Sequence, residues 1–206
     1  PNVGKSTLFN LLTGLNQKIG NFPGITVDKK VGYCKLANNQ RAEIVDLPGT
    51  YSLYPKSRDE SIVFQVLADK HNVSHPELII LVADATNLRR NLLLYTQVAD
   101  LGLPVILALN MIDMAKKEGL EIDTDLLSQR LGIQVVAISA RGNLGLDELK
   151  TAIVNRSTLA TQTAGADMCA LAPEATNDVR EVLAADNDYY ALQMLHQHEH
   201  ILNLSP

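Results

Sequence analysis

The hydrophobic and polar positions of this chain follow two alternating periodicities between residues 78 and 154. Apolar runs such as LIILVA and VILAL are typical of strands buried on both faces. Stretches with apolar residues every three or four positions lie between and after these runs, and they predict amphipathic helices. The predicted strands are 78–83, 105–109 and 135–139, and the predicted helices are 88–101, 123–131 and 146–154. This alternation predicts an α/β fold whose mostly parallel sheet has right-handed crossovers and helices on both faces.

The pattern before residue 78 predicts two helices, a hairpin and two loops. The expected elements are a helix at 6–13, a loop at 18–26, strands at 27–36 and 41–45, a loop at 51–58 and a helix at 59–69. Gly14 is the expected end of the first helix. The two strands flank the turn Asn38-Asn39 and predict one antiparallel hairpin at the edge of the sheet. Thr124 is the predicted N-cap of the later helix at 123–131.

The chain changes character after residue 154. Residues 157–166 are small and polar, which is typical of a linker. Helical spacing returns at 177–185 and 188–202. We therefore expect one domain at 1–154, a linker at 155–176, and the start of a helical domain at 177–206.

Composition and charge narrow the classes of partner. A hydrophobic content of 46% over 206 residues is enough for a core. The formal net charge of −5 argues against a nucleic-acid-binding surface. Cys34 and Cys169 are the two cysteines and lie far apart, which suits a reducing compartment. No apolar run approaches the ~18 residues of a membrane-spanning helix, so the sequence itself predicts none.

The most specific chemistry lies in the first residues, Asn2-Val3-Gly4-Lys5-Ser6-Thr7. Gly4-Lys5-Ser6 matches the end of the phosphate-binding loop G-x-x-x-x-G-K-[ST]. Backbone N–H groups of such a loop surround phosphates, and the following helix points its positive end at them. Lys5 would bridge the outer phosphates, and the Ser6 hydroxyl would ligate Mg²⁺.

The first glycine of this motif, and the strand expected before it, would lie ahead of Pro1. We therefore expect the domain at 1–154 to lack its first strand. For the same reason, weak GTP binding is expected of residues 1–206 alone.

Two further elements suit the phosphate end of a nucleotide site. Asp46-Leu47-Pro48-Gly49 follows the predicted hairpin; its carboxylate can hold Mg²⁺ through water, and the Gly49 N–H can meet the terminal phosphate. Gly24-Ile25-Thr26 lies in the loop before the hairpin. The Thr26 hydroxyl can ligate Mg²⁺ while the terminal phosphate is present and release it afterwards, as in an order–disorder switch.

Two elements suit the base end. Asn110-Met111-Ile112-Asp113 follows the strand VILAL and matches the base-reading element N-K-x-D, with Met in place of Lys. The Asp113 carboxylate can accept from N1–H and the 2-amino group of guanine, donors that adenine lacks. Asn110 can bond the base and tie down the phosphate loop. Ser139-Ala140-Arg141 follows the last strand, and the Ala140 N–H can donate to guanine O6.

Each of these five elements alone has an ordinary alternative, such as a capping aspartate or a polar turn. Together they occur in the required order and at the edge where parallel sheets bind ligands. Their combination predicts a P-loop GTPase fold, followed by a partial α-helical domain.

The detailed sequences of the motifs resemble those of one protein family. The stretches NVGKSTLFN, NFPGITV, VDLPGTYSL, DATNLRRNL and ALNMID closely resemble the ferrous iron transport protein B (FeoB) family over about residues 1–154. The tail resembles that family's helical spacer domain more loosely.

The resemblance implies a cytosolic domain that binds and slowly hydrolyses GTP, at the N-terminus of a polytopic importer of Fe²⁺ in the bacterial inner membrane. Its partners would be GTP or GDP and the membrane-embedded part of the same chain, with homo-oligomers left open. Mg²⁺ would be the cofactor, held by Ser6, Thr26 and Asp46. The resemblance also implies stimulation by K⁺, with Asn2 as a K⁺ ligand whose cation offsets developing charge.

The catalytic group implied is Lys5, Thr26 and Gly49. Thr50 stands where Ras-like enzymes have glutamine, so no side chain is assigned as a general base, and Tyr51 is interpreted as a packing residue. This departure leaves open a nucleotide-sensing binding module with negligible hydrolysis. A ribosome-assembly GTPase is a further alternative, although the tail is acidic. His196, His198 and His200 are interpreted as exposed helix residues, because only His196 and His200 share a helical face.

Overall fold

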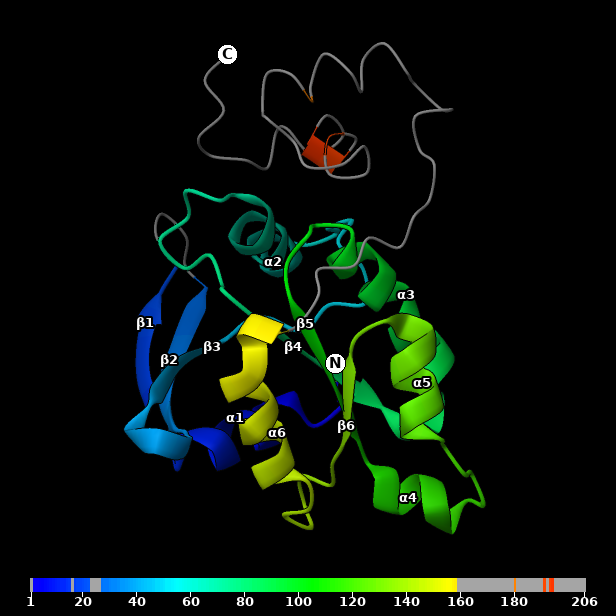
Figure 1. Cartoon of the computed structure of the whole chain (residues 1–206). Coiled ribbons are helices and arrows are strands. Elements are labelled where there is room, and N and C mark those ends of the chain that lie inside the picture. Colours follow the sequence, from blue (N-terminus) through cyan, green and yellow to red (C-terminus); the bar gives the residue numbers. More distant parts are fainter. Residues whose placement is uncertain are drawn as a thin grey trace.

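The computed structural model describes residues 2–15, 17–22, 27–158, 180, 191, 193 and 194, and the structural statements below concern these residues. They form an α/β fold with two three-stranded sheets (Figure 1). The strands are β1 (Gln17–Asn21), β2 (Asp28–Lys35), β3 (Arg41–Asp46), β4 (Ile79–Asp84), β5 (Val105–Asn110) and β6 (Gln134–Ala137). The α-helices are α1 (Lys5–Thr13), α2 (Arg58–Ala68), α3 (Leu88–Ala99), α4 (Ile112–Lys117), α5 (Thr124–Leu131) and α6 (Leu146–Val154). Short 3₁₀ turns are η1 (Ala37–Asn39), η2 (Ala85–Asn87) and η3 (Asn155–Thr158).

Sheet A is antiparallel and has the order β1-β2-β3. Its register pairs Gln17 with Gly32 and Tyr33 with Glu43. The inner face of β2 packs directly on α1 at Gly32. The contact is so close that a Cβ atom added at Gly32 would lie 2.3 Å from Thr13 Cγ2. This close approach fixes α1, and the loop at its N-terminus, against sheet A.

Sheet B is parallel and has the order β4-β5-β6. All six residues of its central strand, β5, are buried. Leu107 and Leu109 face a core shared with α2 and α3, whereas Ile106 and Ala108 face a second core shared with α1 and α6. Because successive side chains of a strand point to opposite faces, one apolar run serves both cores. The carboxyl end of this strand is therefore rigidly placed.

A groove of about 650 Å³ separates the edge of β3 from the edge of β4. Ile44 of β3 and Ile80 and Val82 of β4 line it and are half-buried. The sequence predicts β4 as a strand buried on both faces, but only Leu81 and Ala83 of this strand are buried. The strand expected ahead of Pro1 remains a prediction.

Most predicted elements agree with the structure within two residues, but two predictions, the loop at 18–21 and the Thr124 cap, are wrong. Residues 18–21 are predicted as loop and instead belong to β1, whose five exposed residues are held by pairing with β2. The predicted hairpin is present as β2 and β3, and β1 extends it to a three-stranded antiparallel sheet. The cap of α5 is Asp123, whose carboxylate accepts from the Leu126 N–H at 2.8 Å, and Thr124 is the first helical residue.

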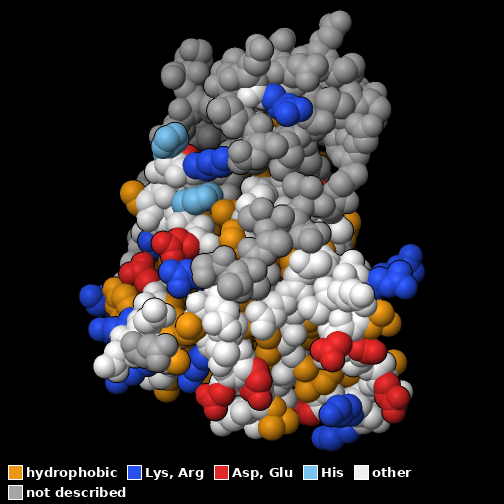
Figure 2. Space-filling model, in the orientation of Figure 1, with side chains coloured by type: hydrophobic (Ala, Val, Ile, Leu, Met, Phe, Trp, Pro, Cys, Tyr) orange, Lys and Arg blue, Asp and Glu red, His pale blue; other side chains and the backbone are white. Residues whose placement is uncertain are grey.

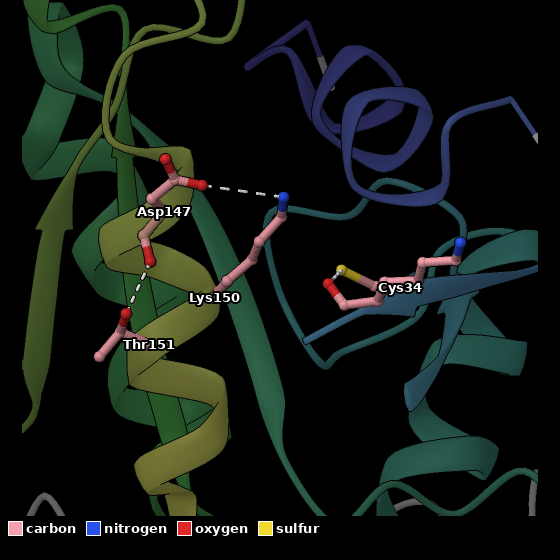
Figure 3. Close-up of polar contacts among 5 residues, drawn as sticks. Cys34, Asp147, Lys150 and Thr151 are labelled. Atoms are coloured by element: carbon pink, nitrogen blue, oxygen red, sulfur yellow. Dashed lines mark hydrogen bonds and ion pairs between the residues drawn. The ribbon is translucent and has the colours of Figure 1, made fainter. Parts of the chain in front are cut away.

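Cys34 of β2 is fully buried beside α6 (Figure 3). Its thiol lies 3.6 Å from the Lys35 carbonyl oxygen. Burial raises the pKa of this thiol above its ordinary value, and the charge of Lys150 on α6 partly opposes that rise. Cys34 is thus an unreactive packing residue at the junction of sheet A and α6.

Acidic and basic side chains are interspersed on the face shown in Figure 2. No helix among the described residues combines the length and the apolar character that crossing a bilayer requires. The predicted tail helices at 177–185 and 188–202, with His196, His198 and His200, lie outside the described residues, apart from Arg180, Ala191, Gln193 and Met194, which are helical.

Candidate functional site

The phosphate loop runs into the N-terminus of α1. Gly4 adopts φ +82°, a left-handed conformation in which other residues are strained. A Cβ atom at Gly4 would also lie 2.3 Å from Asn110 Nδ2, so both the backbone conformation and the space require glycine here. Ser6 and Thr7 follow in the first turn and are exposed. The free N–H groups and positive end of this helix favour an anion.

Lys5 and Asp46 form an ion pair across the site. Asp46 is the last residue of β3, and its side chain is 7% exposed, compared with 34% for Lys5. The cation expected to meet phosphates is therefore held by the carboxylate expected to meet Mg²⁺.

Asn110, at the end of β5, joins the phosphate loop to the last loop of the site. Its Nδ2 donates to the Val3 carbonyl oxygen at 2.9 Å, and its Oδ1 accepts from the Ala140 N–H at 2.9 Å. The side chain is 3% exposed, so both bonds are shielded from water. The predicted tie to the phosphate loop is present. The Ala140 N–H, predicted to donate to guanine O6, donates to Asn110 in this structure.

Asp113 lies in the first turn of α4, beside the buried Ser139. The Ser139 hydroxyl donates to the Asp113 carboxylate, and this bond holds the pKa of that carboxyl below its ordinary value. The N–H groups of Asp113 and Met114 and the charge of Lys117 act in the same direction, while burial opposes them. The same hydroxyl accepts from the Gly142 N–H at 3.2 Å, so its orientation is fixed. Asp113 is therefore an ionised acceptor at neutral pH.

The loop that follows Asp46 is fastened at three points. The Thr50 hydroxyl lies 2.6 Å from the Ser52 carbonyl oxygen and 3.3 Å from Glu60 Oε1. The Arg90 guanidinium carbon lies 3.7 Å from the centroid of the Tyr51 ring. The third point joins the Leu53 N–H to Gln97 Oε1 at 2.8 Å.

Sequence reasoning missed Glu60, Arg90 and Gln97 as partners of this loop. Two signals were present. Ser57 and Glu60 have the spacing of a capping box, and Glu60 does reach back to the Lys56 N–H at 2.8 Å. Arg90 lies in the DATNLRRNL stretch, which general GTPase motifs do not account for.

One cleft of about 890 Å³ gathers most of the predicted site residues. Those that line it are Asn2, Val3, Gly4, Lys5, Ser6, Thr7, Leu47, Pro48, Gly49, Asn110, Met111, Asp113, Ser139, Ala140 and Arg141. Asp46 lines the neighbouring groove and forms its ion pair with Lys5, which lines the cleft. Gly24, Ile25 and Thr26 lie outside the described residues. Asp84, which the sequence did not single out, also lines the cleft.

Comparison with known proteins identifies close relatives. The family model described as Ferrous iron transport protein B matches residues 1–153. The Fe(2+) transporter FeoB of Salmonella typhimurium strain LT2 is 46% identical over 153 residues, which cover 74% of this chain and 20% of the relative. That of Leptospira biflexa is 44% identical over 151 residues, covering 73% and 21%. The chain thus spans about a fifth of the length of these relatives.

Solved structures give the same result. The cytosolic domain of the T. maritima FeoB iron transporter in its GMPPNP form has a TM-score of 0.82 at 37% identity, covering 100% of this chain and 84% of that one. A mutant of S. thermophilus NFeoB bound to GDP has a TM-score of 0.81 at 39% identity, covering 100% and 81%. These matches confirm the predicted P-loop GTPase fold and leave the ribosome-assembly alternative without support. The chain belongs to the ferrous iron transport protein B family.

Proposed function

We propose that this chain binds GTP and GDP in the 890 Å³ cleft and hydrolyses GTP slowly. The observation that carries the proposal is the buried Asn110 side chain, which bonds the phosphate loop and the Ser139–Arg141 loop at the same time. This bridge places a phosphate-binding end and a carboxylate able to read guanine in one cleft. The relatives whose structures contain GMPPNP and GDP support the same use of the cleft.

Guanine recognition falls to Asp113. Its ionised carboxylate has two oxygens that can accept from N1–H and the 2-amino group of the base. Adenine would leave that charge without a partner, which costs about 10⁴-fold in affinity at a site of this kind. Met111 and Arg141 border this end of the cleft, and Ala140 lets the base approach the backbone.

The phosphate end fits Mg²⁺, because Ser6 and Asp46 offer hard oxygen donors beside the phosphate loop, and Thr26 is proposed as a third. Bound there, Mg²⁺ supplies charge neutralisation to the phosphates. Lys5 leaves Asp46 to contact the outer phosphates, and the Gly49 N–H orients the terminal one. These two groups, with Thr26, form the proposed catalytic set. Gly24 and Ile25 are proposed to line the same loop.

No side chain is assigned as general base. The Thr50 hydroxyl is occupied by Ser52 and Glu60, and the Tyr51 ring packs against Arg90. This geometry also favours the second candidate function, a nucleotide sensor with negligible hydrolysis. Single-turnover GTP hydrolysis distinguishes the two, because a rate equal to that in buffer supports the sensor.

Asn2 is the proposed K⁺ ligand. It lines the cleft beside the phosphate loop with φ +61°, a conformation that asparagine tolerates. A cation there would offset charge that develops on the phosphates, which predicts faster hydrolysis in K⁺ than in Na⁺ and a smaller difference after Asn2→Ala. Equal rates in the two salts for the unchanged chain would remove this role.

The full-length protein is proposed to import Fe²⁺ across the bacterial inner membrane, with this domain on the cytoplasmic face and its nucleotide state regulating uptake. The proposed organisation is a GTPase domain at 1–154, a linker at 155–176 and the start of a helical domain at 177–206. The names of the relatives as Fe(2+) transporters support this proposal. Uptake of radioactive iron by cells with full-length Lys5→Ala protein tests it, and uptake equal to wild type would contradict it.

A further inference from the structure

The segment Tyr51–Leu53 is attached to α3 by side chains that the proposed hydrolysis does not use. Arg90 covers the Tyr51 ring at 3.7 Å, a distance typical of a strong cation–π contact. Seven residues further along α3, Gln97 Oε1 accepts from the Leu53 N–H at 2.8 Å. Residues seven apart lie on one face of a helix. One face of α3 therefore holds this segment by a side chain and by the backbone.

The attachment bears on Gly49, the residue proposed to meet the terminal phosphate. A chain spans at most about 3.6 Å per residue, so Tyr51 cannot lie more than roughly 7 Å along the chain from Gly49. On the other side, Asp46 is fixed as the last residue of β3. Leu47–Thr50 is thus a four-residue bridge held at both ends, and few backbone arrangements remain open to it.

We propose that Arg90 is a positioning residue for the terminal phosphate. It holds Tyr51 on α3 and so keeps the Gly49 N–H near the phosphate loop before the nucleotide arrives. Ordering a backbone residue costs about 1–2 kcal/mol, and a bridge that is already restrained loses less freedom when GTP binds. GDP has no terminal phosphate, so its affinity does not depend on this restraint. The inference rests on the proposed function of the cleft.

The test compares Arg90→Gln with Arg89→Gln, since Arg89 is also exposed and carries the same charge on the same turn. Dissociation constants for GMPPNP and GDP are measured by fluorescence competition on the full 206-residue chain, at nucleotide concentrations up to millimolar. Arg90→Gln is expected to weaken GMPPNP by about two- to fivefold, the strength of one exposed cation–π contact, and to leave GDP unchanged. Arg89→Gln should leave both unchanged.

A second comparison shows whether the effect passes through Tyr51. Tyr51→Leu removes the ring and should weaken GMPPNP like Arg90→Gln, whereas Tyr51→Phe keeps the ring face and should bind like wild type. The double variant Tyr51→Leu with Arg90→Gln should be no weaker than Tyr51→Leu alone. Because the chain has no tryptophan, Tyr51→Trp adds a single fluorescent reporter, whose emission should differ between GMPPNP and GDP only while Arg90 is present.

The outcomes separate the two proposals. If the unchanged chain binds neither nucleotide even at millimolar concentration, the proposed function fails, and this inference fails with it. If the chain binds both, the inference is overturned by any of three results: Arg90→Gln behaving like Arg89→Gln, equal weakening of GMPPNP and GDP, or additive effects of the Tyr51 and Arg90 changes. Equal weakening would mean that Arg90 only supports the fold.

Discussion

The two ends of the cleft are built differently. At the base end, Asn110, Ser139 and Ala140 are each less than 5% exposed and are joined by hydrogen bonds between β5 and the loop after β6. At the phosphate end, Ser6 and Thr7 are exposed, and Lys5 is engaged with Asp46. The base end is held by a buried hydrogen bond, whereas the two charged groups of the phosphate end are paired with each other. Under the proposed function, the base end supplies the affinity common to GDP and GTP, and the phosphate end distinguishes them.

The largest expected effect comes from the base end. Asp113→Asn replaces an acceptor of two charge-assisted bonds by an amide that can accept only one, at a loss of about 1.5–3 kcal/mol per bond. We expect GDP and GTP affinities to fall together by about 10²–10⁴-fold, and XDP, which has an oxygen in place of the 2-amino group, to bind better than to the wild type. Titration calorimetry measures all three. Asp125→Asn on the exposed first turn of α5 is the matched control.

Lys5→Ala tests the phosphate end. Without the lysine, charge that develops on the transferring phosphate loses a partner, and hydrolysis should fall by about 10²–10³-fold. GTP affinity should fall more than GDP affinity, because GDP lacks the outermost phosphate. Lys116→Ala, on the surface of α4, should leave both unchanged. An equal loss for the two nucleotides would show that the ends are not specialised in this way.

Asn110→Ala breaks the link between the two ends. It leaves the Val3 carbonyl and the Ala140 N–H without their partner in a buried place, which costs about 1–3 kcal/mol for each group. Urea unfolding should show a loss of about 2–6 kcal/mol, with GDP and GTP weakened in parallel. A variant as stable as the wild type would contradict the view that this end is held together by Asn110.

The smallest effect is a pH shift. The depressed pKa of Asp113 means that its carboxylate interactions are present above the ordinary value near 3.8 and are lost as pH falls through the lower, folded value. Ser139→Ala removes the largest cause, so the folded pKa should rise toward the ordinary one, and base recognition should fail at a higher pH. Carbon-13 NMR of the Asp113 carboxyl group, titrated from neutral to acidic pH, measures this. An unchanged titration would show that Ser139 does not hold the carboxylate.

How far sequence predicts the structure also differs between regions. Continuous apolar runs locate β4, β5 and β6, although only β5 is buried along its whole length. The base-end motifs lie at the ends of β5 and β6. By contrast, β1 has five exposed residues without alternation, and only its pairing with β2 makes it a strand. Helix α4 has six residues, too few for a periodic pattern to be seen.

Contacts between distant elements were the least predictable part of the site. The Arg90–Tyr51 stack joins residues 39 positions apart, and neither side chain signals the other in the sequence. The Ala140 N–H was expected to face the base, but the amide of Asn110 competes for it at 2.9 Å. Such pairings depend on how the loops pack against the sheets, and the local periodicity of the sequence does not predict that packing.

The burial of Cys34 makes its thiol a probe of local opening in this protein. Its thiol sits where sheet A, which carries Asp46, packs against α6, so a thiol reagent reaches it only when the two separate. In a Cys169→Ser background, the labelling rate of Cys34 therefore reports how often these two elements separate. The free energy of such local opening ranges from near zero to that of global unfolding. A nucleotide that binds only the closed arrangement must slow the labelling in proportion to its occupancy. The labelling rate of Cys34 therefore measures how often the part of the fold that carries Asp46 opens, and how strongly a nucleotide suppresses that opening.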